Sequence, residues 1–256
     1  MSIKVSIITL SYNGEKYIRE TIDSCLNQTY PNVEIIVIDD CSSDNTINIL
    51  KEYGEKIRLY QNEENQGISK NLNRAVNLSQ GEYFTLLGHD DLFAKNHVEI
   101  MLKEFTGKEA FVHCNSFLID KEGKVFGTGV NDFKQRLKTQ FIKIFLSFGT
   151  VIHSPGVMIK KEYFNKVKGW DERYKNYGEW LVWIKMASVA KVKYCTKVKA
   201  YYRRHDTNIT NSFQNENVKS DLLDYRDYCI KTAVSNLNIY EQAIFYLLKL
   251  LKKVKK

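Results

Sequence analysis

Short β-branched runs alternate with helical patterns through the first 90 residues of this 256-residue chain, and this alternation limits the folds open to it. It is typical of parallel strands joined by crossover helices. Strands are predicted at Val5–Leu10, Val33–Asp39, Ile57–Asn62 and Tyr83–Leu87. We therefore expect an α/β fold whose first half is Rossmann-like, with a mainly parallel central sheet.

Three helices are predicted to connect these strands. Between the first two strands, apolar residues at positions 18, 22, 25 and 26 form one stripe, and Tyr30-Pro31 ends that helix. Ser42 or Asp44 can cap a helix that reaches Tyr53, and a third helix is predicted at Ser69–Leu78. The first half thus has the pattern of a nucleotide-binding unit.

The pattern loosens beyond residue 110. Strands are predicted at Phe111–Phe117 and Val157–Ile159, with a hairpin at Lys121–Lys124 and a helix at Phe133–Leu146. The final stretch, Asn217–Lys256, is helical in pattern. We expect a second half of less regular structure followed by C-terminal helices.

Composition argues against several other classes of protein. Hydrophobic residues make up 43% of the chain and only 2 prolines occur, which predicts a sizeable core and no long disordered segment. The five cysteines are scattered without a CxxC pair, so neither a zinc site nor a redox motif is expected. The net charge of +8 suits nucleic acid, an anionic membrane or a diphosphate, but the basic residues are dispersed apart from the tail and no nucleic-acid-binding motif occurs. Nucleic acid is therefore not an expected partner.

Hydropathy predicts a cytoplasmic protein. No apolar run approaches the roughly 20 residues that span a bilayer, and Val5–Leu10 is too short for a signal-peptide core. From Ile244 onward, however, leucines interleave with lysines. This pattern fits either an amphipathic helix at the inner, anionic face of a membrane or a helix docked on the domain with solvated lysines.

Polar side chains follow three of the predicted strands, where ligands bind in open α/β sheets. They are Tyr12 and Asn13, Asp39 and Asp40, and Asp90 and Asp91. Adjacent carboxylates repel each other unless a cation, a proton or a hydrogen-bond donor compensates, and magnesium and manganese prefer oxygen ligands. Each acidic pair alone also fits a helix cap or an Asx turn. Their joint occurrence at neighbouring strand ends favours a binding site.

The motifs at these positions resemble those of the inverting family-two glycosyltransferases with the GT-A fold, over residues 2–205. The resemblance rests first on Val5–Asn13, Gln28–Pro31 and Ile38–Asp44. It implies a GT-A domain at residues 1–215, with a nucleotide-sugar-binding half at 1–105 and an acceptor half at 106–215. The remaining residues, 216–256, then form a C-terminal helical appendage.

The resemblance also implies a donor site for a nucleotide-sugar. Thr9, Leu10 and Tyr12 are expected to line the base and ribose, and Asp39 to accept a hydrogen bond from the uracil imide. Cytosine lacks that N–H group, so the donor is expected to be a UDP-sugar.

A second donor motif, Asn65–Asn73, resembles the family's Asn-x-Gly loop and the helix after it. Asn65 and Gly67 are therefore expected at the donor. Leu72 stands where many members carry arginine, and the positive role is assigned to Lys70 instead.

The metal motif departs from the family pattern, because Gly88 stands where the first acid of Asp-x-Asp is expected. Asp90 and Asp91 remain as ligands for Mn²⁺ or Mg²⁺, with Asp90 also facing the donor diphosphate. His89 is either a further ligand or a solvent-facing residue. The stretch Tyr201–His205 resembles the family's closing motif, which makes His205 a third metal ligand.

Two further roles follow from the resemblance. Arg204 is expected to pair with the diphosphate. Glu179 stands where the family has the aspartate that takes the proton of the acceptor hydroxyl, and a glutamate can do the same. Glu179 alternatively serves only as a negative charge in the first turn of a helix, and Asp171 is the second candidate for the base.

The predicted activity is inverting transfer of a hexosyl or N-acetylhexosaminyl group from a UDP-sugar to a hydroxyl of a glycan or lipid-linked acceptor. Two alternatives are open. A sugar nucleotidyltransferase would share the acids and the metal but needs a glycine-rich loop, whereas Ser11–Gly14 holds one glycine. A catalytically weak or inactive nucleotide- or carbohydrate-binding protein would explain the changed acids.

Overall fold

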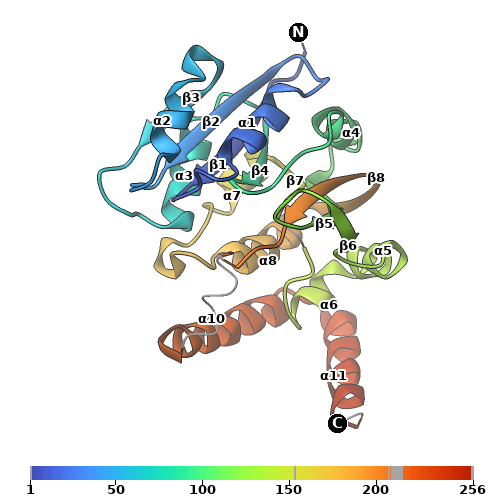
Figure 1. Ribbon diagram of the computed structural model, residues 1–256. Coiled ribbons are helices and arrows are strands. Elements are labelled where there is room, and N and C mark those ends of the chain that lie inside the picture. Colours follow the sequence, from blue (N-terminus) through green and yellow to red (C-terminus); the bar gives the residue numbers. More distant parts are fainter. Residues whose placement is uncertain (1, 153, 207, 209–215, 255–256) are drawn as a thin grey trace.

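The computed structural model describes residues 2–152, 154–206, 208 and 216–254 (Figure 1). A central sheet lies between helices on its two faces, and two long helices follow at the C-terminal end. The strands are β1 (Val5–Ser11), β2 (Val33–Asp39), β3 (Arg58–Gln61), β4 (Tyr83–Gly88), β5 (Glu109–Ile119), β6 (Val125–Thr128), β7 (Val157–Lys160) and β8 (Lys191–Arg203).

The helices alternate with the strands in the first half of the chain and accumulate in the second half. They are α1 (Ile18–Leu26), α2 (Thr46–Lys51), α3 (Ile68–Leu78), α4 (His97–Lys103), α5 (Asp132–Gln140), α6 (Ile142–Leu146), α7 (Lys161–Lys166), α8 (Glu179–Val189), α10 (Glu216–Ser235) and α11 (Ile239–Val254). In the part of the chain that the structure describes, two 3₁₀ helices occur, at Gly54–Lys56 and Glu172–Tyr174.

The sheet has the order β3-β2-β1-β4-β7-β5-β6, and β8 pairs with β5 beside this path. The pairs β1–β2, β1–β4, β2–β3 and β5–β8 are parallel. Strand β7 runs antiparallel to both β4 and β5, and β6 runs antiparallel to β5. The predicted α/β class with a mainly parallel sheet is confirmed.

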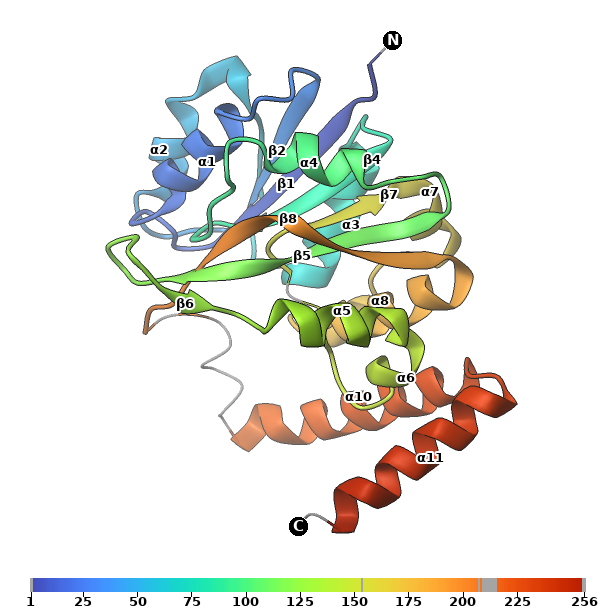
Figure 2. The same ribbon diagram turned by 90° about the vertical axis from the view of Figure 1, so that its right-hand side faces the viewer.

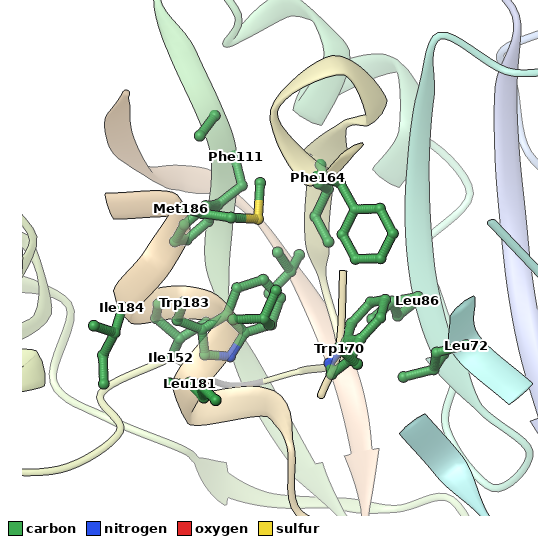
Figure 3. Packing of buried hydrophobic residues seen from close by; sticks show 14 of the residues in the cluster. Leu72, Leu86, Phe111, Ile152, Phe164, Trp170, Leu181, Trp183, Ile184 and Met186 are labelled. Carbon is green, nitrogen blue, oxygen red and sulfur yellow. The ribbon is translucent and has the colours of Figure 1, made fainter. Parts of the chain in front are cut away.

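Alternation of side chains along the strands builds one core on each face of the sheet. Ile8 of β1 joins the core that α3 and α8 cover, and its neighbour Ile7 joins the core that α1, α2 and α4 cover. Figure 3 shows the first core, in which Trp183 of α8 packs against Phe111 of β5 with ring centroids 5.0 Å apart. The strand ends are thereby held at one edge of a rigid support.

Two predictions need correction. The helix predicted at Phe133–Leu146 is two helices, because the backbone leaves the helical region at Phe141 (φ −113°, ψ 37°). The helical stretch at the C-terminus forms α10 and α11, in agreement with the expected C-terminal helices. Asp90 and Asp91 do not cap a helix, which was one interpretation of this pair, because the next helix begins at His97.

Strand β8 is the largest element that the pattern did not predict. Its thirteen residues alternate lysines with apolar residues only in part, and its pairing with β5 shifts register between Cys114 and Asn115. Such a shift breaks the period-two pattern that identifies a strand in sequence.

The C-terminal helices pack on the second half of the preceding chain. Tyr225, Cys229 and Ala233 of α10 belong to the core that α8 helps to form, and Phe245 of α11 packs against Phe148 with ring centroids 4.8 Å apart. Within the described residues, no helix is both long enough and apolar enough to cross a membrane.

Candidate donor and metal site

The carboxyl ends of β1, β2 and β4 lie side by side, and the acidic pairs lie at this edge. Asp39 is fully buried (0% exposed) and accepts hydrogen bonds from Ser11 Oγ at 2.9 Å, from Ser42 N at 3.0 Å and from Ser42 Oγ at 2.5 Å. A carboxylate offers about four acceptor positions. One acceptor position of Asp39 is thus left for a ligand such as a nucleobase.

The three residues expected around the base and ribose are exposed to very different degrees. Thr9 is fully buried, and its hydroxyl has no hydrogen-bond partner among the described residues. Leu10 is partly buried against the core. Tyr12 is 49% exposed, so of these three it presents the most side-chain surface to a nucleotide.

Asp40 organises the loop that leads into α3, a role that the sequence did not reveal. Its carboxylate accepts hydrogen bonds from Asn62 Nδ2 at 2.8 Å, Gln66 N at 2.8 Å and Gly67 N at 3.0 Å. Gly67 has a φ of 80°, in the left-handed region that favours glycine. Asn65 lies in the same loop, with Nδ2 3.5 Å from the Asp40 carbonyl oxygen.

Two cationic side chains line a groove of about 660 Å³ along α3. Lys70 donates a hydrogen bond to Gln66, and Arg74 donates one to Asn62. Leu72 is buried in the core, so its side chain faces away from that groove. Arg74 is therefore a second cation beside the loop of Asn65 and Gly67, two positions after the one where the family pattern placed arginine.

Asp90 and His205 are brought together as the sequence predicted. The imidazole Nε2 of His205 lies 2.8 Å from Asp90 Oδ2, and Asn208 Nδ2 donates to the same oxygen at 3.0 Å. The sequence did not single out Asn208. The ring of His89 instead packs against Gly14, where an added Cβ would lie 2.6 Å from His89 Cδ2.

Asp91 is buried and turns toward β8. Its Oδ1 accepts a hydrogen bond from the backbone N–H of Arg203 at 2.9 Å. Burial raises the pKa of Asp91 well above its usual value, and the negative charge of Asp90 raises it further, against the opposing effect of the Arg203 N–H group.

One oxygen of each acid converges on Gly88. A Cβ at this glycine would lie 2.9 Å from Asp90 Oδ1 and 3.0 Å from Asp91 Oδ2. Among the described residues, neither of these two oxygens receives a hydrogen bond. In the same part of the chain, no group of three or more His, Cys, Asp or Glu residues has the geometry of a metal site. The predicted set of Asp90, Asp91 and His205 thus offers two converging oxygens and a nearby imidazole, not a closed cage.

Arg203 connects three separate segments at this edge of the sheet, and the sequence did not reveal this role. It is 1% exposed, and its guanidinium donates to the carbonyl oxygens of Asp90 at 2.9 Å and Asp120 at 3.2 Å and to Glu20 Oε2 at 2.5 Å. It lies 4.6 Å from the ring centroid of Tyr17. The His205 ring packs on the same tyrosine, with centroids 5.1 Å apart.

Arg204, by contrast, is exposed. Its guanidinium donates to Tyr202 Oη at 3.4 Å, so it is available to a ligand in solution. Residues two apart in an extended segment share a face, which places Arg203 with His205 and turns Arg204 away. A strand assignment for this motif would have identified Arg203.

Glu179 begins α8 and is partly buried. Burial raises its pKa from the usual value, and a hydrogen bond from Ser154 Oγ opposes that rise. A residue of α10 contacts the same first turn, because Leu181 N donates to Tyr225 Oη at 3.0 Å. Asp171 is engaged elsewhere: Arg173 donates to its carboxylate at 2.9 and 2.6 Å, and that pairing lowers the pKa of Asp171.

The sequence profile of glycosyl transferase family 2 matches residues 6–167. The chain belongs to glycosyl transferase family 2. Membership decides against the nucleotidyltransferase interpretation. The matched region holds Asp39, Asp90 and Asp91 and ends before Glu179 and His205.

Relatives of this family 2 protein occur in several bacteria. It is 36% identical over 215 residues to an uncharacterised glycosyltransferase of Rickettsia typhi, which covers 83% of this chain and 67% of that protein. It is 31% identical over 199 residues to an Escherichia coli chondroitin synthase, which covers 76% of this chain but 28% of the synthase. The likeness to the synthase is therefore to one part of a longer protein.

Solved structures with the same fold include S. aureus TarS (residues 1–349) in complex with UDP-GlcNAc, which has a TM-score of 0.71 at 21% identity over 95% of this chain and 69% of that one. The mannosyltransferase PcManGT of Pyrobaculum calidifontis, in complex with GDP-Man and Mn²⁺, has a TM-score of 0.65 at 14% identity over 98% of this chain and 81% of that one. The predicted GT-A fold is confirmed.

Proposed function

We propose that this family 2 glycosyltransferase moves a hexosyl or N-acetylhexosaminyl group from a UDP-sugar to a hydroxyl of a glycan or lipid-linked acceptor, with inversion at the anomeric carbon. The observation that supports this best is the convergence of Asp90 Oδ1 and Asp91 Oδ2 beside the His205–Asp90 contact, at the strand edge that also carries Asp39.

The donor nucleotide is proposed to bind along the ends of β1 and β2. Tyr12 has enough exposed surface for its ring to stack on the base, and the remaining acceptor position of Asp39 suits the uracil imide. Lys70 and Arg204 supply positive charge for the diphosphate. Asn65 and Gly67 belong to the loop beside Asp40, at the edge of the proposed donor site. The TarS complex shows that the same fold accommodates UDP-GlcNAc.

The residues at Gly88 fit a hard divalent ion. Two carboxylate oxygens that receive no hydrogen bond from the described residues converge there, and carboxylate oxygen and imidazole nitrogen are both ligands of Mn²⁺ or Mg²⁺. Asp90, Asp91 and His205 would hold the ion, and the diphosphate would complete its shell. The ion would offset the charge that develops on the leaving diphosphate.

Glu179 is proposed to accept the proton of the attacking hydroxyl. Its raised pKa makes the ionised form a stronger base than an exposed glutamate, and Ser154 orients the carboxylate. This role requires the acceptor to approach from the face of the sugar opposite the diphosphate.

A lipid-linked acceptor would place the protein at a membrane surface. The lysine-rich helix α11, with exposed leucines along its length, supports peripheral contact with an anionic bilayer.

The first test is calorimetric titration of UDP, CDP and GDP with and without Mn²⁺, on wild type and on Asp90→Ala. Selective binding of UDP that needs both Mn²⁺ and Asp90 is the expected result, followed by turnover in a screen of UDP-sugars. Equal affinity for the three nucleotides would refute the uridine assignment. Binding without turnover of any donor, including its hydrolysis, would favour the inactive binding protein.

A further inference from the structure

Helix α5 leaves an apolar stripe uncovered. Phe133, Leu137 and Phe141 follow each other at four-residue spacing and are 71%, 42% and 53% exposed. The opposite side of the helix, with Gln135 and Thr139, is buried. Folded proteins rarely leave large contiguous apolar patches in water, so this stripe marks a surface with a partner.

Helix α11 carries a second stripe. Tyr240, Ile244, Leu247 and Leu251 lie at helical spacing along one side and are between 43% and 79% exposed, whereas Phe245 on the inner side is buried. Helix α11 packs on the rest of the fold through the face that carries Phe245. The exposed stripe lies outside this packing.

The two stripes meet at a groove of about 820 Å³. Phe141 lines it from the end of α5, and Tyr240 and Ile244 line it from α11. Figure 1 shows α5 and α11 at the right-hand side of the molecule. Figure 2 views that side and shows α11 below α5. Together they form one surface, called the α5–α11 face below.

The α5–α11 face is strongly basic. In the part of the chain that the structure describes, the basic residues of α5 and of the groove form no salt bridge. They are Lys108, Lys134, Arg136, Lys138, Lys143 and Lys191. Of the nearby acids, Asp132 is paired with Lys199 at 2.8 Å, and Glu241 lines the groove.

We propose that the α5–α11 face binds an anionic lipid bilayer, with both apolar stripes at the boundary of headgroups and acyl chains and the basic residues against lipid phosphates. A bilayer with anionic lipids satisfies apolar and basic groups together. A second copy of the chain would bring like charges together, and nucleic acid would leave the phenylalanines in water. The inference extends the membrane contact of the proposed function from α11 to α5 and the groove, and it rests on that function for its lipid-linked acceptor.

Vesicle flotation of the full chain tests this face. Vesicles of phosphatidylcholine alone are compared with vesicles that contain one quarter phosphatidylglycerol. The variants are Phe133→Ser with Phe141→Ser, Leu247→Ser with Leu251→Ser, and Lys134→Gln with Lys138→Gln. Ile3→Ser with Leu26→Ser is the matched control, since both are exposed apolar residues outside the groove.

Wild type is expected to bind anionic vesicles at least about tenfold more strongly than neutral ones, and each α5 or α11 pair to lower binding by about tenfold or more. The control should bind like wild type. UDP titration shows whether each variant is folded and keeps its donor site, so loss of vesicle binding with intact UDP binding concerns this face alone.

The proposal is overturned if only the α11 pair matters, if neutral and anionic vesicles bind equally, or if wild type fails to float while forming a dimer that the α5 pair abolishes. Each of these outcomes leaves the donor-site assignment untouched, because UDP binding is measured independently.

Discussion

The Nε2 atom of His205 lies 2.8 Å from Oδ2 of Asp90, although the two residues are 115 positions apart in the chain. Asp90 follows β4, and His205 follows β8. The contact therefore forms only when β8 has paired with β5 and its end has reached the end of β4, where Leu92 and Tyr201 form an isolated bridge. The segments that contain Asp90 and His205 are therefore brought together by the tertiary fold.

Replacing His205 tests whether this contact serves metal binding. His205→Gln is expected to weaken the Mn²⁺-dependent part of UDP binding by at least about tenfold and to leave metal-free UDP binding unchanged. Titrations of UDP at fixed Mn²⁺ concentrations measure both quantities. His89→Gln is the control, because that ring packs on Gly14. Equal losses with and without Mn²⁺ would contradict a ligand role.

Glu179→Gln is expected to lower kcat by about 10²–10⁴-fold with little change in UDP affinity, since it removes the base and not the donor site. In wild type, activity should rise with pH as Glu179 ionises, at a pH above the usual glutamate range because burial raises its pKa.

Ser154→Ala provides a finer test of the same carboxylate. The Ser154 hydrogen bond lowers the pKa of Glu179, so its loss should move the rising limb of the pH–kcat profile to higher pH. Glu179→Gln should lack that limb. An unchanged limb in Glu179→Gln would show that another group, with Asp171 the next candidate, is the base.

His97 should make stability fall in acid. It is buried against Phe93, with ring centroids 4.1 Å apart, and burial lowers its pKa to about 3. The unfolded chain binds the proton at the ordinary histidine pKa of about 6.5, so this contribution is present above that pH and is lost as pH falls toward 3. The loss amounts to about 1.4 kcal/mol per pH unit within that window. His97→Leu should show a shallower fall in denaturant unfolding between pH 7 and 4, and a slope equal to that of wild type would refute the assignment.

Arg203 and Arg204 provide a matched pair. Arg203→Met removes the hydrogen bonds of a buried guanidinium to three carbonyls and to Glu20 and should lower the free energy of unfolding by about 2–4 kcal/mol. Arg204→Met removes an exposed group and should change it by less than about 0.5 kcal/mol. Arg204→Met should instead weaken UDP binding if it contacts the diphosphate. Urea unfolding and UDP titration of both variants measure these effects.

Local sequence patterns were sufficient to predict most of the first half of the fold. Strands β1, β2 and β4 and the acids after them were predictable, because a buried strand and the turn that follows it depend on residues close in sequence. The same holds for Glu179 as the first residue of a helix, although the hydroxyl of Ser154 that holds it comes from 25 positions earlier.

The roles of Arg203, Asn208 and Tyr225 were decided by tertiary structure. Arg203 reaches Glu20 across 183 positions, and Tyr225 caps a turn 44 positions away. The sequence by itself determined the α/β class, the edge of the sheet that carries the candidate site and the position of Asp39, Asp90 and Asp91 at the strand ends, because each depends on a short stretch of chain. Which oxygens converge, which arginine is buried and which helix faces stay exposed depend on how distant segments pack, and a buried polar group takes whichever partners that packing provides.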